Sequence, residues 1–578
     1  MPARFSTLEK KILEELSENN LIQHVREISK YDRMSGSEDE TRAVDYVAKK
    51  LESYGINVQQ YRFEAYVGRP ESAEVQVLSP DNRKILGVAS ALTPSCQEGM
   101  VGELIYVGPG DEDSFARADV RGKVLLIDGI AEPEIAKRAD EKDAVGEIFI
   151  NDENPHEGTV SVVWGTPRWE TAHLLPATPC VSINQNDGEY LKTLVKNKPV
   201  EVKVTTHAWR GWTKLPVLIG TIPGRAENRF TLLSGHIDSW YYGAMDNATA
   251  NAMVIEVGRV MSKNRRALRR GLKLAFWSGH SHARFSGSTM YADNFWGELE
   301  KGCIAHVNAD SIGSQAATVL TEAAVMPETR DLAAAAVAKI THQELSGHAF
   351  SRMGDQSFWG IGIPSVFNSL SEIPTDSEVK TVSLFGPSPT GIGWWWHTVY
   401  DTSDKIDSKL LLRDTKVYAL VTLALCTDLI IPLNYYRTAT ELKNQLSKLK
   451  TTGPIDLRLL RSKTEILRRK LGDLNALSKR KSLNEKRAEL VNSGLIRLSR
   501  ILVPIMQTRS GRFDHDLAVS IPPVPCLEQV RKLAELDPST DEFKFRTVGA
   551  RRDLNQLYAA LDEAIETVDS VFRNLRRA

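Results

Sequence analysis

The chain has 578 residues, more than one typical domain holds, so its length predicts several domains. With 73 Lys and Arg against 74 Asp and Glu, the net charge of -1 gives no overall basic field for nucleic acid or an anionic membrane. A hydrophobic content of 42% and a charged content of 25% are typical of globular proteins and exclude wholesale disorder.

The first expected element is one amphipathic helix that starts the core domain. Its apolar positions Val44, Val47, Ala48 and Leu51 follow a helical period, and Gly55 is a typical residue just after a helix end. The residues before it lack the uninterrupted apolar run of a secretory signal, so the expected location is the cytoplasm.

From about residue 70 to 210 the pattern changes to short β-rich runs separated by Gly, Pro, Asn and Asp. Examples are the runs at 103–107, 123–127 and 147–150. This pattern of short β-rich runs separated by turn residues predicts a separate, mainly β module inserted into the first domain.

Between about residues 215 and 435 apolar strands alternate with helical stretches, which predicts an α/β fold with a mostly parallel sheet covered by helices on both faces. Ligands of such folds bind at the carboxyl ends of the strands. The longest apolar stretch, 417–433, contains polar residues and falls short of the roughly 20 residues of a membrane span, so a buried helix is expected there.

The tail, 436–578, has a helical pattern nearly throughout. Two apolar stripes predict packed helices, and they consist of Leu460, Leu467, Leu471 and Leu474, and of Leu554, Leu557, Leu561, Ile565, Val568, Phe572 and Leu575. The Lys- and Arg-rich stretch at 443–486 is interpreted as a solvated helix face rather than a nucleic-acid surface.

Five cysteines lie far apart, with no pair at CxxC spacing. Their odd number cannot form a fully paired framework within one chain, so free thiols are expected.

The first group with chemical potential is His236-Ile-Asp238, which closes an apolar run. Because side chains alternate along a strand, His236 and Asp238 project to the same side, and Asp238 can orient the imidazole. Standing alone, this pair is more often a structural histidine beside a surface carboxylate.

Three further groups follow at expected strand ends or helix starts. Asp246 precedes a helix, Asp310 follows a strand, and His397 lies just before another helix. Imidazoles and carboxylates that converge on one crevice form the ligand set of a zinc or related hydrolytic site, where the metal lowers the pKa of a bound water to about 7.

With these motifs the chain resembles the zinc aminopeptidases of the MH clan, within the glutamate carboxypeptidase II and transferrin receptor-like branch. The matching stretches, which cover roughly residues 1–435, are Arg33-Met-Ser-Gly-Ser, Gly235-His-Ile-Asp-Ser-Trp, Gly243-Ala-Met-Asp-Asn, Gly287-Ser288, Asn308-Ala-Asp310, Gly354-Asp-Gln-Ser-Phe with Gly362-Ile-Pro, and Trp396-His-Thr-Val-Tyr-Asp.

The resemblance implies a role for each matching residue. His236 and Asp310 would bind one metal ion, His397 the other, and Asp246 would bridge the two ions. Asp238 would support His236 from behind.

The same resemblance gives the domain organisation. Residues 1–70 and 211–435 form the metallohydrolase catalytic domain, 71–210 a protease-associated-like insert, and 436–578 a helical domain that would make a homodimer.

One departure from the family pattern concerns a Glu-Glu pair, in which the first residue acts as general base and the second as metal ligand. Here the chain has His280-Ser281-His282, and one extra residue leaves the alignment open. We favour His280 as a ligand because it lies nearer the strand end, and His282 as a candidate base or a polar wall residue. Imidazole serves either purpose, but neutral ligands make a second divalent ion harder to hold.

Two alternatives stay open. The residues 279–283 resemble a nucleophile elbow, which would make Ser281 the nucleophile of a serine hydrolase. The transferrin receptor-like branch also includes scaffolds that have lost their metals, although retention of His236, Asp246, Asp310 and His397 argues against that reading.

Substrate clues are few. Aromatic residues flank the first and last ligand motifs at 240–242 and 394–396 and would form an aromatic wall if they face the crevice. Arg284 is a candidate for binding a substrate carboxylate, or a structural arginine.

The sequence therefore predicts a metal-dependent hydrolase of an amide bond, in a peptide or in a small molecule. One or two divalent ions are expected, with zinc as the metal. No nucleic-acid or membrane partner is expected.

Overall fold

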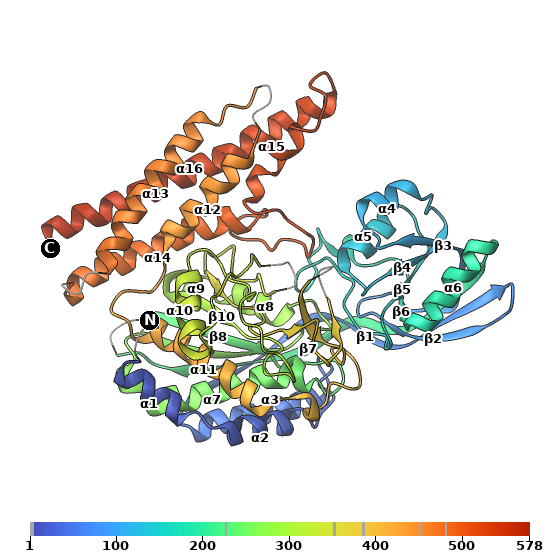
Figure 1. The fold of residues 1–578 in the computed structure, drawn as a ribbon, viewed down its shortest axis with the longest axis horizontal. Coiled ribbons are helices and arrows are strands. Elements are labelled where there is room, and N and C mark those ends of the chain that lie inside the picture. The colour runs from blue at the N-terminus through green and yellow to red at the C-terminus, as the bar shows by residue number, and fades with distance from the viewer. Residues whose placement is uncertain (1–4, 226–227, 351–353, 384–387, 451–453, 480–482) are drawn as a thin grey trace.

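The computed structural model describes residues 5–225, 228–350, 354–383, 388–450, 454–479 and 483–578. Figure 1 shows three parts: a central sheet with helices on its faces, an insert to one side that contains β2–β6, and a group of long C-terminal helices. The first four residues lie outside the described residues. They belong to the N-terminal segment that lacks the apolar run of a secretory signal.

Between residues 5 and 54, all described, the structure has three helices where the sequence pattern predicted one. They are α1 (Thr7–Glu15), α2 (Glu18–Ile28) and the predicted helix, α3 (Glu38–Ser53). Each begins after a serine whose side chain accepts a backbone N–H bond of the first turn, and these serines are Ser6, Ser17 and Ser37. The first two helices are short, so their periodicity is a weak signal.

Within the described residues, eleven strands form one mixed sheet in the order β1-β2-β6-β5-β4-β3-β7-β9-β8-β10-β11, with β1 also paired to β7. The strands are β1 (Asn57–Ser79), β2 (Lys84–Ala89), β3 (Cys96–Gly108), β4 (Lys123–Asp128), β5 (Gly146–Ile150), β6 (Cys180–Ile183), β7 (Glu201–Ile222), β8 (Phe230–His236), β9 (Gly271–Trp277), β10 (Cys303–Asn308) and β11 (Ser365–Val366). A small separate sheet has the order β12 (Ile373–Pro374), β14 (Thr390–Gly393), β13 (Thr381–Val382).

In the central part, β9, β8, β10 and β11 are parallel neighbours, whereas β7 runs antiparallel to β9. Every residue of β8 is buried, as expected for a strand covered on both faces. The helices of this part are α7 (Ala250–Lys263), α8 (Ser286–Asn294), α9 (Trp296–Gly302), α10 (Arg330–Thr341) and α11 (Ser408–Thr427). Helices α3, α7 and α11 contact strands of this part, as do α8 and α9, and the predicted α/β fold class is confirmed.

The insert is joined to the central part by two long strands. β1 and β7 pair antiparallel from Asn57 and Thr221 at one end to Ser79 and Glu201 at the other, so the predicted boundaries near 70 and 210 fall inside continuous strands. The insert contains the predicted strands, and its described residues also form three helices that the sequence pattern did not indicate: α4 (Glu112–Arg117), α5 (Pro133–Glu141) and α6 (Gln185–Asn197). These helices are short, and they cover hydrophobic cores of the parallel strands β3–β6.

The C-terminal part is helical, as predicted. Its described helices are α12 (Tyr435–Lys448), α13 (Arg458–Ser478), α14 (Glu485–Gln507), α15 (Glu528–Leu533) and α16 (Asp541–Arg577). The two predicted apolar stripes lie on α13 and α16, where most of their residues are buried and the two helices contact each other. Throughout the described part of the chain, no helix has the length and apolar character needed to cross a membrane.

Candidate metal centre

The predicted site residues lie at one edge of the central sheet. His236 is the last residue of β8, His280 follows the end of β9, and Asp310 follows the end of β10. Since these strands are parallel neighbours, their carboxyl ends meet at the same edge. Asp246 lies just before α7, and His397 lies on the segment between β14 and α11.

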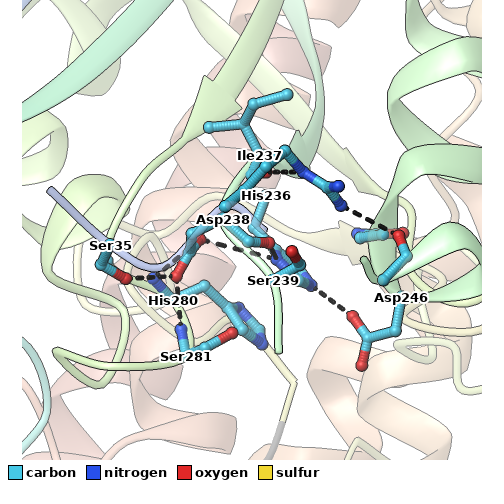
Figure 2. Close-up of polar contacts among 12 residues, drawn as sticks. Ser35, His236, Ile237, Asp238, Ser239, Asp246, His280 and Ser281 are labelled. Carbon is cyan, nitrogen blue, oxygen red and sulfur yellow. Dashed lines mark hydrogen bonds and ion pairs between the residues drawn. The ribbon is translucent and has the colours of Figure 1, made fainter. Parts of the chain in front are cut away.

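The structure brings the four residues of the predicted ligand set together. Nε2 of His236 lies 2.9 Å from Oδ1 of Asp246 and 3.6 Å from Oδ1 of Asp310. The other carboxylate oxygen of Asp246, Oδ2, lies 3.0 Å from Nε2 of His397. Figure 2 shows the side chains of His236 and Asp246 pointing toward each other. Asp246 therefore stands between two imidazoles.

His280 joins this group. Its ring stacks on the ring of His236, with centroids 3.8 Å apart and planes inclined by 6°. One ligand atom from each of His236, His280 and Asp310 lies within 4.8 Å of the others, which is a spacing that allows all three to bind one ion.

The donors present fit a divalent cation. Nε2 of His236 and Oδ1 of Asp246 are buried and lie 2.9 Å apart as an ion pair, and neither has a partner in hydrogen-bond geometry among the described residues. Buried polar atoms normally have partners. Imidazole nitrogens and carboxylate oxygens are the ligands of catalytic zinc and related metals, so an ion at this position would satisfy both atoms.

The carboxylates of the site favour a positive charge between them, which a proton on His236 supplies when no metal is bound and which a cation would supply in its place. Although burial opposes it, the Asp310 and Asp246 carboxylates hold the pKa of His236 well above its usual value. Burial also opposes ionisation of Asp246, but its contact with His236 holds the pKa of Asp246 well below the usual range. Burial and the neighbouring His236 lower the pKa of His280, which stays neutral and keeps a lone pair for a metal.

Asp238 lies on the side of His236 that faces away from Asp246 (Figure 2). Nδ1 of His236 is 2.9 Å from the Asp238 carbonyl oxygen and 3.6 Å from its carboxylate. The carboxylate accepts hydrogen bonds from the Ser35 hydroxyl at 2.7 Å and the Ser281 N–H at 2.9 Å. Asp238 thus fixes His236 and ties the loop after β9 to the residues before α3, which is a positioning role.

His282 has a different environment from His280. It is 1% exposed, its Nδ1 lies 3.0 Å from the Ser35 hydroxyl, and its ring packs on Trp240 with centroids 4.3 Å apart. It is absent from the described residues that line the cavity at the metal centre. The structure thus places His280, and not His282, in the cavity wall, and the role of His282 as a general base stays a prediction.

Ser281 lacks the partner that a nucleophilic serine needs. Its hydroxyl makes no hydrogen bond within the described chain, whereas its N–H is bound by Asp238 and its carbonyl accepts from Thr159. A serine nucleophile is activated by a base within hydrogen-bond reach. The geometry gives the elbow interpretation no support.

Two buried residues hold the loop from His236 to Asp246. The Arg33 guanidinium donates to the carbonyl oxygens of Ile237, Tyr242 and Gly243 at 2.7, 2.6 and 2.9 Å. The Asp401 carboxylate accepts the N–H of Met245 at 2.8 Å and of Asp246 at 3.0 Å. Both belong to stretches that resemble the family, but their positioning roles could not be assigned from the sequence.

The insert also contributes to the site, through a residue that sequence reasoning missed. Nδ1 of His397 lies 2.7 Å from the backbone carbonyl of Glu157, and the Tyr241 hydroxyl donates to the Glu157 carboxylate at 2.6 Å. Glu157 carries no sequence signal for this role, because it lies 240 residues from His397.

A cavity of about 560 Å³ opens at the metal centre, and residues of the insert form part of its wall. Of the predicted aromatic wall, Trp240 and Trp396 line this cavity, and Trp396 stacks on His397 with centroids 3.4 Å apart. Trp395 is instead buried in the main hydrophobic core. Arg284, the candidate for binding a substrate carboxylate, also lines the cavity.

A sheet covered by helices, with imidazoles and carboxylates gathered at the carboxyl ends of its parallel strands, defines the class of metal-dependent hydrolases. Residues 218–422 match the sequence profile described as Peptidase family M28. This match fits the zinc peptidases of the MH clan and confirms the resemblance seen in the motifs.

A Zea mays protein named "Probable glutamate carboxypeptidase VP8" is 21% identical over 496 residues, covering 72% of this chain and 68% of the relative. A solved zinc aminopeptidase from Bacillus subtilis matches with a TM-score of 0.53 and 20% identity, covering 72% of this chain and 96% of that one. A solved peptidase M28 precursor from Shewanella amazonensis matches with a TM-score of 0.57 and 19% identity, at the same coverage. At these identities the two structures show the fold. Together with the family match, these relatives support a metal-dependent peptide hydrolase that uses a divalent metal.

Proposed function

We propose that this chain hydrolyses an amide bond, either an N-terminal peptide bond or the amide of a small molecule, with one principal zinc ion. The ion would be held by His236, His280 and Asp310, with Oδ1 of Asp246 facing the same position. The observation that carries the proposal is the stacking of His280 on His236 beside Asp310, because it completes a set of three protein ligands. Catalytic zinc sites commonly have three protein ligands and one open position.

The preference for one ion follows from the donors on the other side of Asp246. There, Oδ2 of Asp246 and Nε2 of His397 face each other at 3.0 Å. The resemblance places a glutamate metal ligand after β9, and this chain has His280 and His282 there instead. Two donors are fewer than a stable zinc site uses. His397 would therefore act mainly by fixing the orientation of Asp246 through their hydrogen bond.

When bound, the metal supplies a Lewis acid that polarises the amide carbonyl and lowers the pKa of a water molecule. The chain's own residues prepare the site for this. The contacts of Asp238 with His236 keep Nδ1 engaged, so Nε2 points toward Asp246 and is left for a metal (Figure 2). Trp240 and Trp396 form apolar walls that exclude water and accommodate an apolar group of the substrate.

Metal analysis with matched variants tests this proposal. The purified protein should contain about one zinc ion per chain by mass spectrometry of the metal, in keeping with a single ligand set. His280→Ala and His236→Ala should lose both metal and turnover. The exposed His173→Ala serves as a control that should retain both.

Each outcome decides between alternatives. Two tightly bound ions per chain would refute the one-ion assignment, and full activity in His280→Ala would refute its role as ligand. A folded protein with no stoichiometric metal, even after zinc is supplied, would support the metal-free scaffold. A screen of aminoacyl-arylamides against amides without an amino acid would identify the substrate class.

We further propose a cytoplasmic homodimer in which the helical part 436–578 makes the contact and the insert serves as a protease-associated-like domain. Exposed apolar side chains on α16, Phe545 at 75% and Val548 at 47%, support the dimer, and the five free cysteines are compatible with the cytoplasm. Light scattering after gel filtration should give twice the chain mass. Phe545→Ser should shift the mass toward that of one chain.

A further inference from the structure

Arg284 is a buried cation in the wall of the cavity at the metal centre. The residue is 7% exposed, and it lines the cavity together with Asp246, His280, Asp310 and His397. Its Nε atom is buried without a hydrogen-bond partner, and no carboxylate of the described chain forms an ion pair with its guanidinium. A buried charge without a partner is costly, so native proteins normally pair such groups.

Aromatic rings replace part of the missing solvation. The Arg284 Cζ atom lies 5.5 Å from the ring centre of Trp164 and 5.7 Å from that of Phe285, and these two rings stack on each other at 4.0 Å. Cation–π contacts of this kind stabilise a guanidinium without neutralising it. The group therefore keeps donors that match a carboxylate in geometry.

The backbone at Arg284 has an uncommon conformation. Arg284 has φ 45° and Phe285 has φ 67°, both in the left-handed region that residues with a Cβ rarely adopt. The Arg284 carbonyl accepts the N–H of Gly165 at 2.6 Å, which fixes the turn from the side of the insert. Strain of this kind clusters at ligand-binding sites, where the surroundings enforce it.

The other acidic groups of the cavity wall are Glu132, Glu322 and Glu372, and none of them forms a described ion pair with Arg284. Glu322 accepts hydrogen bonds from Thr321 and Ser346, and Glu372 accepts one from Thr390. The carboxylates of Asp246 and Asp310 face the metal position. The described chain thus supplies acceptors for its metal and none for Arg284, so an anionic group of a ligand is the fitting partner.

We propose that Arg284 is a specificity-determining residue that binds a free carboxylate on the substrate, so that the preferred substrates are N-acyl amino acids and dipeptides. This inference rests on the proposed amide hydrolysis. Phe285 contacts both the ring of His280, at 4.1 Å between centroids, and the guanidinium of Arg284. Because one side chain spans both groups, the carboxylate lies close to the amide that is cleaved, which favours short substrates.

The first test compares two substrates that differ only in charge. N-acetyl-leucine carries the carboxylate, and N-acetyl-leucinamide replaces it with a neutral amide. The zinc-loaded protein should prefer the carboxylate by roughly ten- to a hundredfold in kcat/KM, the range expected for charge-assisted hydrogen bonds. Arg284→Met should abolish this preference, and Arg284→Lys should retain part of it because the charge stays while the planar fork is lost.

The second test measures binding without turnover. Isothermal titration of the zinc-loaded protein with leucine and with leucinol, which lacks the carboxylate, should show tighter binding of leucine. Arg284→Met should remove that difference while its zinc content and thermal unfolding stay near those of the wild type. Equal binding of leucine in wild type and Arg284→Met would overturn the inference.

The two proposals fail in different ways. Hydrolysis of both substrates at equal rates by the wild type would overturn the role of Arg284 and leave amide hydrolysis intact. A zinc-loaded protein that hydrolyses neither these substrates nor arylamides, yet binds leucine through Arg284, would overturn amide hydrolysis and retain the carboxylate site.

Discussion

A buried carboxyl group in the insert gives a stability prediction with a definite pH dependence. Glu147 lies on β5 with 0% exposure. Its Oε1 accepts the Thr178 hydroxyl at 2.6 Å, while its Oε2 has no partner among the described residues. Burial raises the pKa of Glu147 to about 8.

The sign of the effect follows from the two protonation states. In the unfolded chain the Glu147 carboxyl ionises near 4.5, whereas in the folded protein it keeps its proton up to about 8. Folding then requires proton uptake between these values, so this residue lowers the free energy of unfolding as pH rises through that window. At about 1.36 kcal/mol per pH unit, the penalty is about 3 kcal/mol at pH 7 and close to zero at pH 4.5.

Glu147→Gln keeps the shape of the side chain and removes the titration. We expect this variant to be more stable than the wild type by about 3 kcal/mol at pH 7, and to differ little at pH 4.5. Hydrogen exchange of peptides that cover β4 and β5, measured for both proteins at each pH, reports the stability of the insert itself. The exposed residue Glu201→Gln is the control and should change exchange at neither pH. Equal effects of Glu147→Gln at both pH values, or weaker protection at pH 7, would refute the reasoning.

Further predictions concern the centre itself. Arg33→Met should lower the free energy of unfolding by at least about 3 kcal/mol, because several buried carbonyl groups lose a charged donor, and urea denaturation of the chain measures this. Ser281→Ala should retain most of kcat, and a chelator should abolish activity in both proteins, whereas loss of a true serine nucleophile costs about 10⁶-fold. His282→Phe should keep its metal and lose about 1–3 kcal/mol of stability with the Ser35 hydrogen bond, and a drop in kcat of the 10²–10⁴-fold expected for loss of a general base would restore His282 to that role.

The sequence was most informative where a side chain's place follows from local chain geometry. Residues at the ends of buried parallel strands must lie at one edge of the sheet, and so His236 and Asp310 could be placed near each other in advance. The two tail stripes were predictable for the same reason, since a helical period alone decides which side chains share a face.

Other features depend on contacts that no local pattern records. The choice between His280 and His282 turns on the backbone after β9, which stacks His280 on His236 and packs His282 on Trp240. The contact of His397 with Glu157 joins segments 240 residues apart. The helices α4 and α5 have only 6 and 9 residues, so each gives a short window in which to recognise a helical period.

The two long paired strands β1 and β7 determine how the molecule can deform. Their ladder runs without a flexible linker from beneath α3 out to the far end of the insert. Rotation of the insert relative to the central part would break backbone hydrogen bonds between β1 and β7. We therefore expect the insert and the central part to move as one rigid unit. We therefore expect the 2.7 Å contact between the Glu157 carbonyl and Nδ1 of His397 to be kept when a ligand enters the cavity.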